Sequence, residues 1–149
     1  MEHYTLKPYT PADHDFVYET KKIVYKKYVE QNWGDWNEDK QKEFFADFIN
    51  KFNKDILIVM LQNEKIGFYH GNNIDDDNFE LGNICILPQF QGKGIGTKIM
   101  QKIIKEHKHQ NIHLQYFKQN PVEKLYIRLG FKKEDETQHH IKMVLNKQI

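Results

Sequence analysis

A glycine-rich loop between a hydrophobic segment and an amphipathic segment most constrains what this chain can form. Residues 79–87 are rich in apolar and β-branched side chains, which predict a strand that Pro88 ends. The loop, residues 91–96, reads QGKGIG, and residues 97–108 then carry apolar side chains at helical spacing. Glycines let a backbone approach a ligand closely, and a helix N-terminus favours an anion. The loop therefore predicts a phosphate-binding site.

Three kinds of glycine-rich phosphate loop compete for this position. A Walker A loop requires a Gly-Lys-Ser/Thr ending that the chain does not contain. A dinucleotide fingerprint that begins at Gly92 requires glycine where Thr97 stands. The third pattern, Gln91-x-x-Gly94-x-Gly96, resembles the Gln/Arg-x-x-Gly-x-Gly/Ala pyrophosphate signature of the GNAT acetyltransferases. An ordinary glycine turn is the alternative interpretation of the loop taken alone.

Two further segments carry the same resemblance. Residues 84–88, ICILP, are similar to the fourth strand of the GNAT family, directly before the loop. Residues 120–131, NPVEKLYIRLGF, resemble the family's Asn…Leu-Tyr-x-x-x-Gly-Phe block at the usual distance downstream. The resemblance is close over residues 79–145, whereas the N-terminal half shares only the order of elements. It implies the GNAT fold, with a central twisted mixed β-sheet flanked by helices.

The periodicity of the whole chain agrees with that fold class, an α/β (α+β) arrangement with a mixed sheet. The predicted strands cover residues 4–7, 55–61, 65–71, 79–87, 111–117, 131–134 and 140–145. The first predicted helix begins at Pro11, after the N-cap Thr10. The others cover about residues 38–52, 97–108 and 120–129, and the polar residues 72–78 predict a hairpin loop. A length of 149 residues predicts one domain, residues 1–149.

The resemblance implies acetyl-CoA as the cofactor. Its pantetheine arm would pair with the backbone of the fourth strand, and its pyrophosphate would lie on the amides of the loop. The implied cofactor-binding residues are Ile84, Ile86, Gln91, Gly92, Lys93, Gly94, Ile95, Gly96, Thr97, Asn120 and Tyr126. Gln91 would brace the loop with its side chain. Ile84 and Ile86 can equally pack in a core, and Asn120 can equally cap the helix at Pro121.

Acetyl transfer to an amine requires a base for the amine and a proton donor for the leaving thiolate. Tyr126 matches the family's tyrosine and is the candidate general acid; its alternative is an ordinary half-buried helix residue. Glu80 is the candidate general base, or else a solvated carboxylate at the start of a strand. Asn83 could position a water molecule or the acceptor. Cys85 faces away from Ile84. We expect it to be a small buried apolar residue and not a nucleophile.

The acceptor would be bound by the first two helices and the loop that connects them. Tyr28, Trp33 and Trp36 are candidates for an aromatic wall that holds an ammonium or an apolar ring. The alternative is that these side chains fasten the helices to the sheet. The acidic run Asp75–Asp77 predicts a solvated loop, and it would favour a cationic acceptor if it overhung the site.

Composition excludes several other classes of function. A formal net charge of +1 and a single arginine, Arg128, argue against nucleic-acid recognition. The lone Cys85 permits no internal disulfide, and the histidines show no metal-ligand spacing, so no metal is expected. No window approaches the ~18 apolar residues of a membrane span. We therefore expect a cytoplasmic protein without a membrane partner. Members of the family that the chain resembles often form homodimers, so the resemblance allows a homodimer.

The sequence thus predicts an enzyme, an acetyl-CoA-dependent N-acetyltransferase. It would move the acetyl group to a primary amine of a small molecule or peptide by direct transfer in a ternary complex. The alternative is a catalytically silent domain that binds acyl-CoA as a sensor or docks to a partner. A nucleotide-binding protein is disfavoured by the motif mismatches at the loop.

Overall fold

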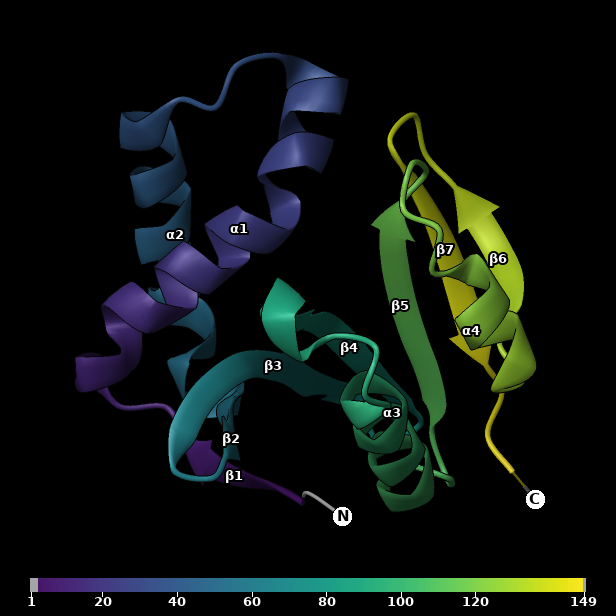
Figure 1. Cartoon of the computed structure of the whole chain (residues 1–149). Helices are drawn as coiled ribbons and strands as arrows, with labels where there is room; N and C mark the ends of the chain where they lie inside the picture. Colours follow the sequence, from purple (N-terminus) through teal and green to yellow (C-terminus); the bar gives the residue numbers. More distant parts are fainter. Residues whose placement is uncertain (1–2, 149) are drawn as a thin grey trace. The chain divides into compact units, whose positions relative to one another are not determined.

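The computed structural model describes residues 3–148, and its helices and strands follow the predicted order (Figure 1). The strands are β1 (Tyr4–Pro8), β2 (Ile56–Leu61), β3 (Glu64–Asp75), β4 (Asn78–Ile86), β5 (Asn111–Phe117), β6 (Lys132–Glu136) and β7 (His140–Leu145). The α-helices are α1 (His14–Trp33), α2 (Glu38–Phe52), α3 (Ile95–Glu106) and α4 (Glu123–Arg128). Short 3₁₀ turns lie at Pro11–Asp13, Asn53–Asp55 and Pro88–Phe90.

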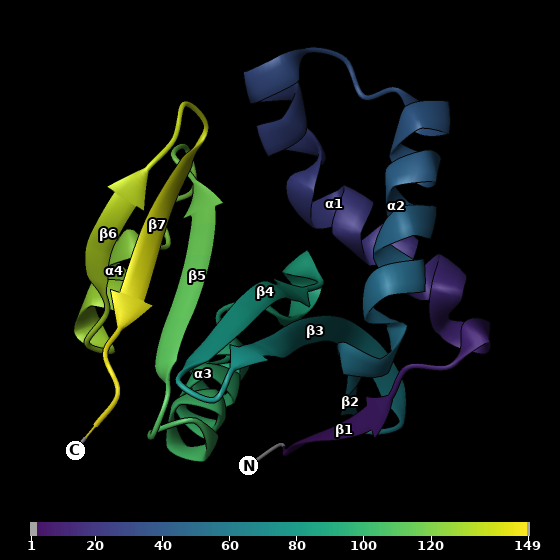
Figure 2. The same ribbon diagram turned by 180° about the vertical axis from the view of Figure 1, so that it is seen from behind.

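The strands form one seven-stranded sheet in the order β1-β2-β3-β4-β5-β7-β6. β1, β2 and β3 pair antiparallel, as do β5, β7 and β6. β4 and β5 pair parallel, with residues 78–80 of β4 facing residues 111–113 of β5. The strand succession is easiest to follow from behind in Figure 2. The sheet is mixed and helices accompany it, so the predicted fold class is confirmed.

The chain divides into two compact units. The first unit comprises Met1–His70 and Asn83–Lys93, and the second comprises Gly71–Gly82 and Gly94–Ile149. The core of the first unit joins α1 and α2 to β2, β3 and the end of β4 through Val17, Tyr18, Phe45, Ile56, Ile58, Phe68 and Cys85. The second unit buries one face of α3 and alternate residues of β5, which follow the helical and strand periods seen in the sequence.

The hairpin between β3 and β4 differs from the predicted one. A loop was expected over residues 72–78, but β3 continues to Asp75 and β4 begins at Asn78. The Asp75 carboxylate accepts hydrogen bonds from the Asp77 backbone N–H at 2.8 Å and from the Asn78 side chain at 3.0 Å. Polar residues have low strand propensity, but neighbouring strands in a sheet satisfy each other's backbone groups. That pairing extends the hairpin and leaves a tight turn.

The segment that follows Asn120 is also less helical than expected. The helix predicted over residues 120–129 is only α4, which begins at Glu123 and ends at Arg128. The Asn120 side-chain oxygen accepts the backbone N–H of Val122 at 3.2 Å, and the Asn120 N–H donates to Phe117 at 2.9 Å. These local bonds make a turn, because an asparagine side chain competes with helical hydrogen bonding. α3, by contrast, starts two residues earlier than predicted, at Ile95.

A buried carboxylate fixes the start of α1. Asp13 is fully buried, and its side chain accepts hydrogen bonds from Lys7 at 3.0 Å and from the Thr10 backbone N–H at 3.0 Å. It also forms an ion pair with Lys65 of β3. Burial alone would raise the pKa of Asp13, but the bonds from Lys65, Thr10 and Lys7 outweigh it and hold that pKa well below its ordinary value. This carboxylate therefore joins β1 and β3 to the first turn of α1.

Replacement of this carboxylate should destabilise the fold strongly. We expect Asp13→Ala to lower the free energy of unfolding by about 3 kcal/mol, the low end for a broken buried ion pair. The low end applies because the Lys7 and Lys65 side chains keep 38% and 34% of their surface exposed and can be hydrated. Urea unfolding at pH 7 measures this change. The matched control is Asp15→Ala, since that side chain is fully exposed and its loss should matter little.

The effect of Asp13→Ala should also depend on pH. The folded pKa of Asp13 lies below the unfolded value of about 3.9, so its contribution is fully present above that value and is lost as the pH falls through the folded pKa. The difference in free energy of unfolding between wild type and Asp13→Ala should therefore decrease below about pH 4. A difference that stays constant down to pH 2.5 would contradict an ionised Asp13 as the source of the stabilisation.

Candidate functional site

The glycine-rich loop has the backbone geometry that its glycines permit. Gly92 has a φ of +78° and Gly94 a φ of +80°, in the left-handed region that favours glycine. A Cβ atom built on either residue, or on Gly96, would meet nothing within 4 Å. The glycines are therefore required for conformation at residues 92 and 94, and the space beside the loop backbone is open to a ligand.

The last three residues of the loop, 94–96, belong to the second unit and lead directly into the first turn of α3. Gly94 is the N-cap residue, and its carbonyl accepts the first helical hydrogen bond, from Lys98 N–H at 3.0 Å. The N–H groups of Ile95, Gly96 and Thr97 point out of the first turn, where a helix has no acceptors of its own. Together with the positive end of the helix dipole, these donors fit a phosphate group.

In the first unit, the Gln91 side chain ties the loop to the end of β4. Its amide nitrogen donates to the Ile86 carbonyl at 2.8 Å. The Gln91 backbone N–H donates to Pro88 at 3.2 Å, and the N–H of Leu87 donates to Ile66 of β3 at 2.9 Å. The bracing role that the family resemblance implied for Gln91 therefore corresponds to a specific contact.

Sequence reasoning missed the role of Gly67 in β3. A Cβ atom on Gly67 would lie 2.2 Å from the carbonyl oxygen of Cys85 and 2.9 Å from the Ile86 side chain. Only glycine permits this close approach of β3 to the end of β4, the strand that would carry the pantetheine arm. An isolated glycine inside a strand pattern is the signal that could have indicated it.

The inner part of β4 places Asn83 beside a buried histidine that the sequence analysis did not single out. The Asn83 amide nitrogen lies 3.4 Å from Nδ1 of His70, which is only 4% exposed. Burial, with a smaller contribution from the charge of Lys21, lowers the pKa of His70 to about 4. His70 is therefore neutral at pH 7, and its Nδ1 can accept a hydrogen bond from Asn83.

Cys85 is unsuited to covalent catalysis. Its side chain is completely buried in the core of the first unit. Burial raises the pKa of its thiol to about 12, so the thiolate that a nucleophilic mechanism requires is scarce at neutral pH. This agrees with the apolar role predicted for Cys85.

The remaining candidate catalytic residues lie in the second unit. Glu80 is exposed near the start of β4 and pairs with His113 of β5. Tyr126 is half-buried on α4, with its ring centroid 5.6 Å from that of Tyr116 and 5.9 Å from that of Phe131. Ring packing therefore holds Tyr126 from two sides. The catalytic roles of Glu80 and Tyr126 stay predictions.

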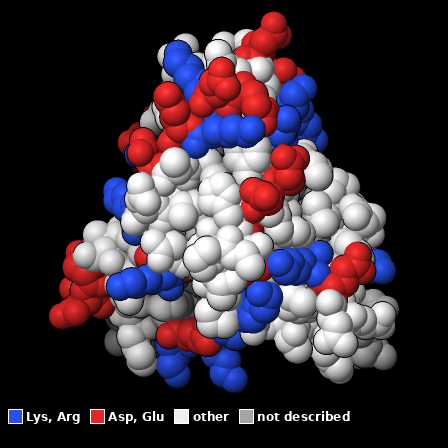
Figure 3. Space-filling model, turned by 90° about the vertical axis from the view of Figure 1, so that its left-hand side faces the viewer, with Lys and Arg blue, Asp and Glu red and all other residues white. Residues whose placement is uncertain are grey.

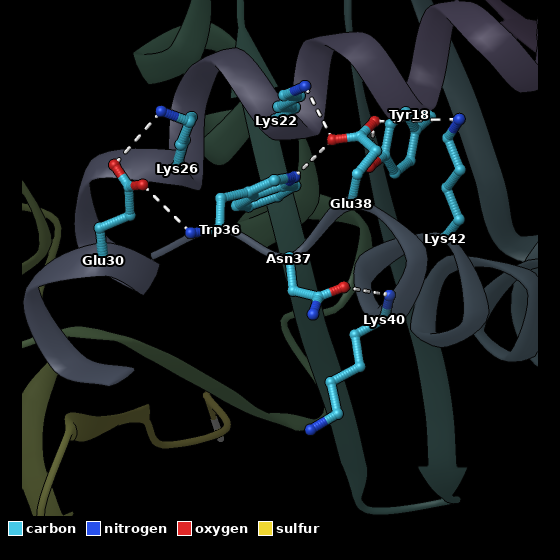
Figure 4. Close-up of polar contacts among 9 residues, drawn as sticks. All are labelled: Tyr18, Lys22, Lys26, Glu30, Trp36, Asn37, Glu38, Lys40 and Lys42. Carbon is cyan, nitrogen blue, oxygen red and sulfur yellow. Dashed lines mark hydrogen bonds and ion pairs between the residues drawn. The ribbon is translucent and has the colours of Figure 1, made fainter. Parts of the chain in front are cut away.

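Trp36, in the connection between α1 and α2, is part of a polar network (Figure 4). The Trp36 indole N–H donates to the Glu38 carboxylate at 2.8 Å, and the Trp36 backbone N–H donates to Glu30 at 3.1 Å. Glu38 also accepts from the Tyr18 hydroxyl at 3.0 Å and from Lys22 at 2.8 Å. Trp36 thus helps to join the two helices to each other.

The other two aromatic candidates differ in exposure. Tyr28 is 6% exposed, whereas Trp33, the last residue of α1, is 57% exposed. Trp33 can therefore meet a ligand more readily than Tyr28 can. Contact between the acceptor and these aromatic side chains stays a prediction.

Charges of both signs are mixed on one face of the molecule, and the described residues form no metal cluster. On the face shown in Figure 3, acidic and basic side chains lie next to one another around an uncharged centre. Within residues 3–148, no group of three or more His, Cys, Asp or Glu side chains is arranged to hold a metal ion. In the same described part of the chain, no helix is long and apolar enough to cross a membrane.

Comparison with known families identifies the class of this protein. The model of the GNAT acetyltransferase domain matches residues 53–133, which is over half of the chain. The chain therefore belongs to the GNAT acetyltransferase family, and the resemblance recognised from the loop and the Leu-Tyr-x-x-x-Gly-Phe block is confirmed. Among curated proteins, no sequence matches this chain.

Solved structures share the fold over almost the whole chain. The PaiA N-acetyltransferase of Thermoplasma acidophilum, solved with coenzyme A, is 20% identical, with 97% of this chain and 99% of that one covered and a TM-score of 0.71. PH1933 of Pyrococcus horikoshii is 18% identical, with 99% and 100% covered and a TM-score of 0.75. The ribosomal-protein-S18-alanine N-acetyltransferase of Escherichia coli is 18% identical, with 99% and 96% covered and a TM-score of 0.67. At these identities the likeness establishes the fold.

Proposed function

We propose that this protein is an acetyl-CoA-dependent N-acetyltransferase that modifies a primary amine of a small molecule or peptide by direct transfer. The observation that carries this proposal is the open glycine loop at the N-terminus of α3, in a chain of the GNAT family. The loop supplies donors for a pyrophosphate, and the chemistry of the family is acetyl transfer. A phosphate-bearing acyl donor accounts for both features.

Specific groups of the chain would hold this cofactor. The N–H groups of Ile95, Gly96 and Thr97 would bind the pyrophosphate, while Gln91 keeps the loop attached to β4. The backbone of Ile84 would pair with the pantetheine arm as a neighbouring strand does. When bound, acetyl-CoA supplies an acetyl group activated as a thioester.

Three side chains would then transfer protons and position the acceptor. The acceptor amine must be deprotonated before it can attack, and Glu80 would take that proton directly or through water. Asn83, fixed by His70, would orient the amine or that water molecule. The Tyr126 hydroxyl would hold the proton that the leaving sulfur needs, since a phenol with an ordinary pKa of about 10 is protonated at neutral pH.

Release of free CoA thiol from acetyl-CoA tests this function. Purified full-length protein is incubated with acetyl-CoA and a panel of polyamines, aminoglycosides, amino acids and lysine peptides, with acceptor-free samples as the control. We expect release that depends on one class of amine. If no amine supports release while acetyl-CoA still raises the melting temperature, the protein is the silent acyl-CoA-binding domain and not a transferase.

A further inference from the structure

Lys21 on α1 is a half-buried cation without a counter-ion among residues 3–148. Its ammonium nitrogen lies 4.4 Å from the centre of the Phe48 ring. In the part of the chain that the structure describes, no carboxylate is within ion-pair distance of it, whereas the next residue, Lys22, pairs with Glu38 at 2.8 Å. Burial lowers the pKa of Lys21. A desolvated ammonium is costly unless an anion or several acceptors compensate it.

The surroundings of Lys21 contain rings and neutral polar groups. Phe48 and Phe52 of α2 lie against the ring of His70, with centroid separations of 4.9 Å and 5.0 Å. His70 contacts Asn83, the residue that directly precedes Ile84 on the strand expected to carry the cofactor arm. The Phe48 ring contacts both Lys21 and His70, and this contact links Lys21 to the pair formed by His70 of β3 and Asn83 of β4. We call Lys21, Phe48, Phe52, His70 and Asn83 the Lys21 cluster.

The Lys21 cluster carries one positive charge and nothing that cancels it. His70 is neutral at pH 7 because its pKa is about 4, and the buried thiol of Cys85 is neutral because its pKa is about 12. A cationic polyamine would be repelled here, and a phosphate dianion would call for a second cation or an arginine. The single arginine, Arg128, belongs to the second unit. One ammonium with one amide and two phenyl rings suits a carboxylate attached to a small apolar group.

We propose that the acceptor of this enzyme carries a carboxylate beside its amine, as a free amino acid does, and that Lys21 binds this carboxylate. The assignment rests on the proposed transferase function, and it makes Lys21 a specificity-determining residue that pairs with the part of the acceptor that does not react. Phe48 and Phe52 supply an apolar surface for the side chain of the amino acid. The acidic run Asp75–Asp77, in contrast, forms the hairpin turn between β3 and β4. There the Asp75 carboxylate accepts hydrogen bonds from Asp77 and Asn78.

Matched acceptors test this proposal. The kcat/KM for phenylalanine is compared with the values for phenylalaninamide and phenylethylamine, which keep the amine and the ring and lack the carboxylate. A similar comparison with methionine and methioninamide covers a non-aromatic side chain. We expect the amino acids to be preferred about ten- to hundredfold, the range for a hydrogen bond to a charged group.

Variants of α1 decide whether Lys21 is the cause. Lys21→Met keeps the aliphatic stem of the side chain. It should abolish the preference for amino acids by lowering kcat/KM only for the acceptors that carry a carboxylate. Lys21→Arg should keep most of the preference. The control is Lys26→Met on the exposed side of α1, where Lys26 pairs with Glu30 at 3.3 Å. Lys21→Met should melt no lower than wild type, because it removes a cation without a counter-ion; a purely structural Lys21 would give a lower melting temperature.

The outcomes separate this inference from the proposed function. Acetylation of carboxylate-free amines as fast as amino acids, or a preference that survives Lys21→Met, would overturn the inference and leave the transferase standing. If no amine is acetylated, the transferase proposal fails, and calorimetric binding of N-acetylphenylalanine against N-acetylphenylethylamine decides the carboxylate site. Binding that requires both the carboxylate and Lys21 supports it, and equal or absent binding of the two compounds overturns it.

Discussion

Tyr126→Phe should lower kcat by about a hundredfold or more, as expected when a general acid is removed. The substitution keeps the ring that packs against Tyr116 and Phe131, so α4 should stay in place. Only the hydroxyl that would protonate the leaving sulfur is lost. The affinity for acetyl-CoA should therefore stay within about twofold, because the α3 amides that are proposed to bind the pyrophosphate are unchanged. Steady-state rates of thiol release and calorimetric titration with acetyl-CoA measure the two quantities.

Tyr116→Phe is the matched control for this prediction. Tyr116 is a buried tyrosine on β5, and its hydroxyl has no hydrogen-bond partner among the residues that the structure describes. Removal of that hydroxyl should leave kcat unchanged. If Tyr126→Phe turned over at the wild-type rate, Tyr126 would have no role in proton transfer. Equal losses in both variants would assign the effect to packing around the rings.

Gly94→Val should weaken acetyl-CoA binding by about a hundredfold or more, since a β-branched residue is a steric outlier at positive φ. Gly94 has a φ of +80° and is the N-cap of α3. Valine can be accommodated only if the loop changes its conformation, and that change would misalign the N–H groups of Ile95, Gly96 and Thr97. The stabilisation of the folded protein by saturating acetyl-CoA, about 2.7 kcal/mol at a hundredfold excess over Kd, should disappear from thermal unfolding curves.

Gly34→Val separates loss of binding from general destabilisation. Gly34 has a φ of +92°, lies at the C-terminal end of α1, and has open space around it, so valine imposes a similar backbone strain there. This variant should melt at a lower temperature and still be stabilised by acetyl-CoA. Normal binding by Gly94→Val would show that the phosphate loop has been assigned to the wrong segment.

The sequence was most informative where short-range chemistry decides structure. The predicted second helix, residues 38–52, has the same bounds as α2, because a regular apolar stripe is a local property of the sequence. The structure adds that the Asn37 side chain caps this helix. The loop at residues 91–96 was equally clear, since glycine is needed wherever φ is positive. The family followed from the loop and the tyrosine block without any knowledge of contacts.

Elements whose bounds depend on distant partners were predicted less well. β3 extends over polar residues as far as Asp75 because β4 pairs with it, and strand propensity alone argued for a loop. The helix expected at Asn120 was shortened by an asparagine side chain that satisfies the turn in place of a helical bond. In both cases hydrogen bonding that periodicity does not report outweighed the local preference.

The sequence by itself therefore determined the fold class and the family, because glycine conformation and hydrophobic periods are properties of neighbouring residues. It also predicted the segment that would bind the cofactor. Only the tertiary structure showed that Trp36 is bonded to Glu38, that Gly67 lies against the carbonyl of Cys85, and that His70 is buried beside Asn83. It also showed that, among the residues described, Lys22 has a counter-ion and Lys21 has none. Burial and charge compensation depend on residues brought together from distant parts of the chain, and packing decides them.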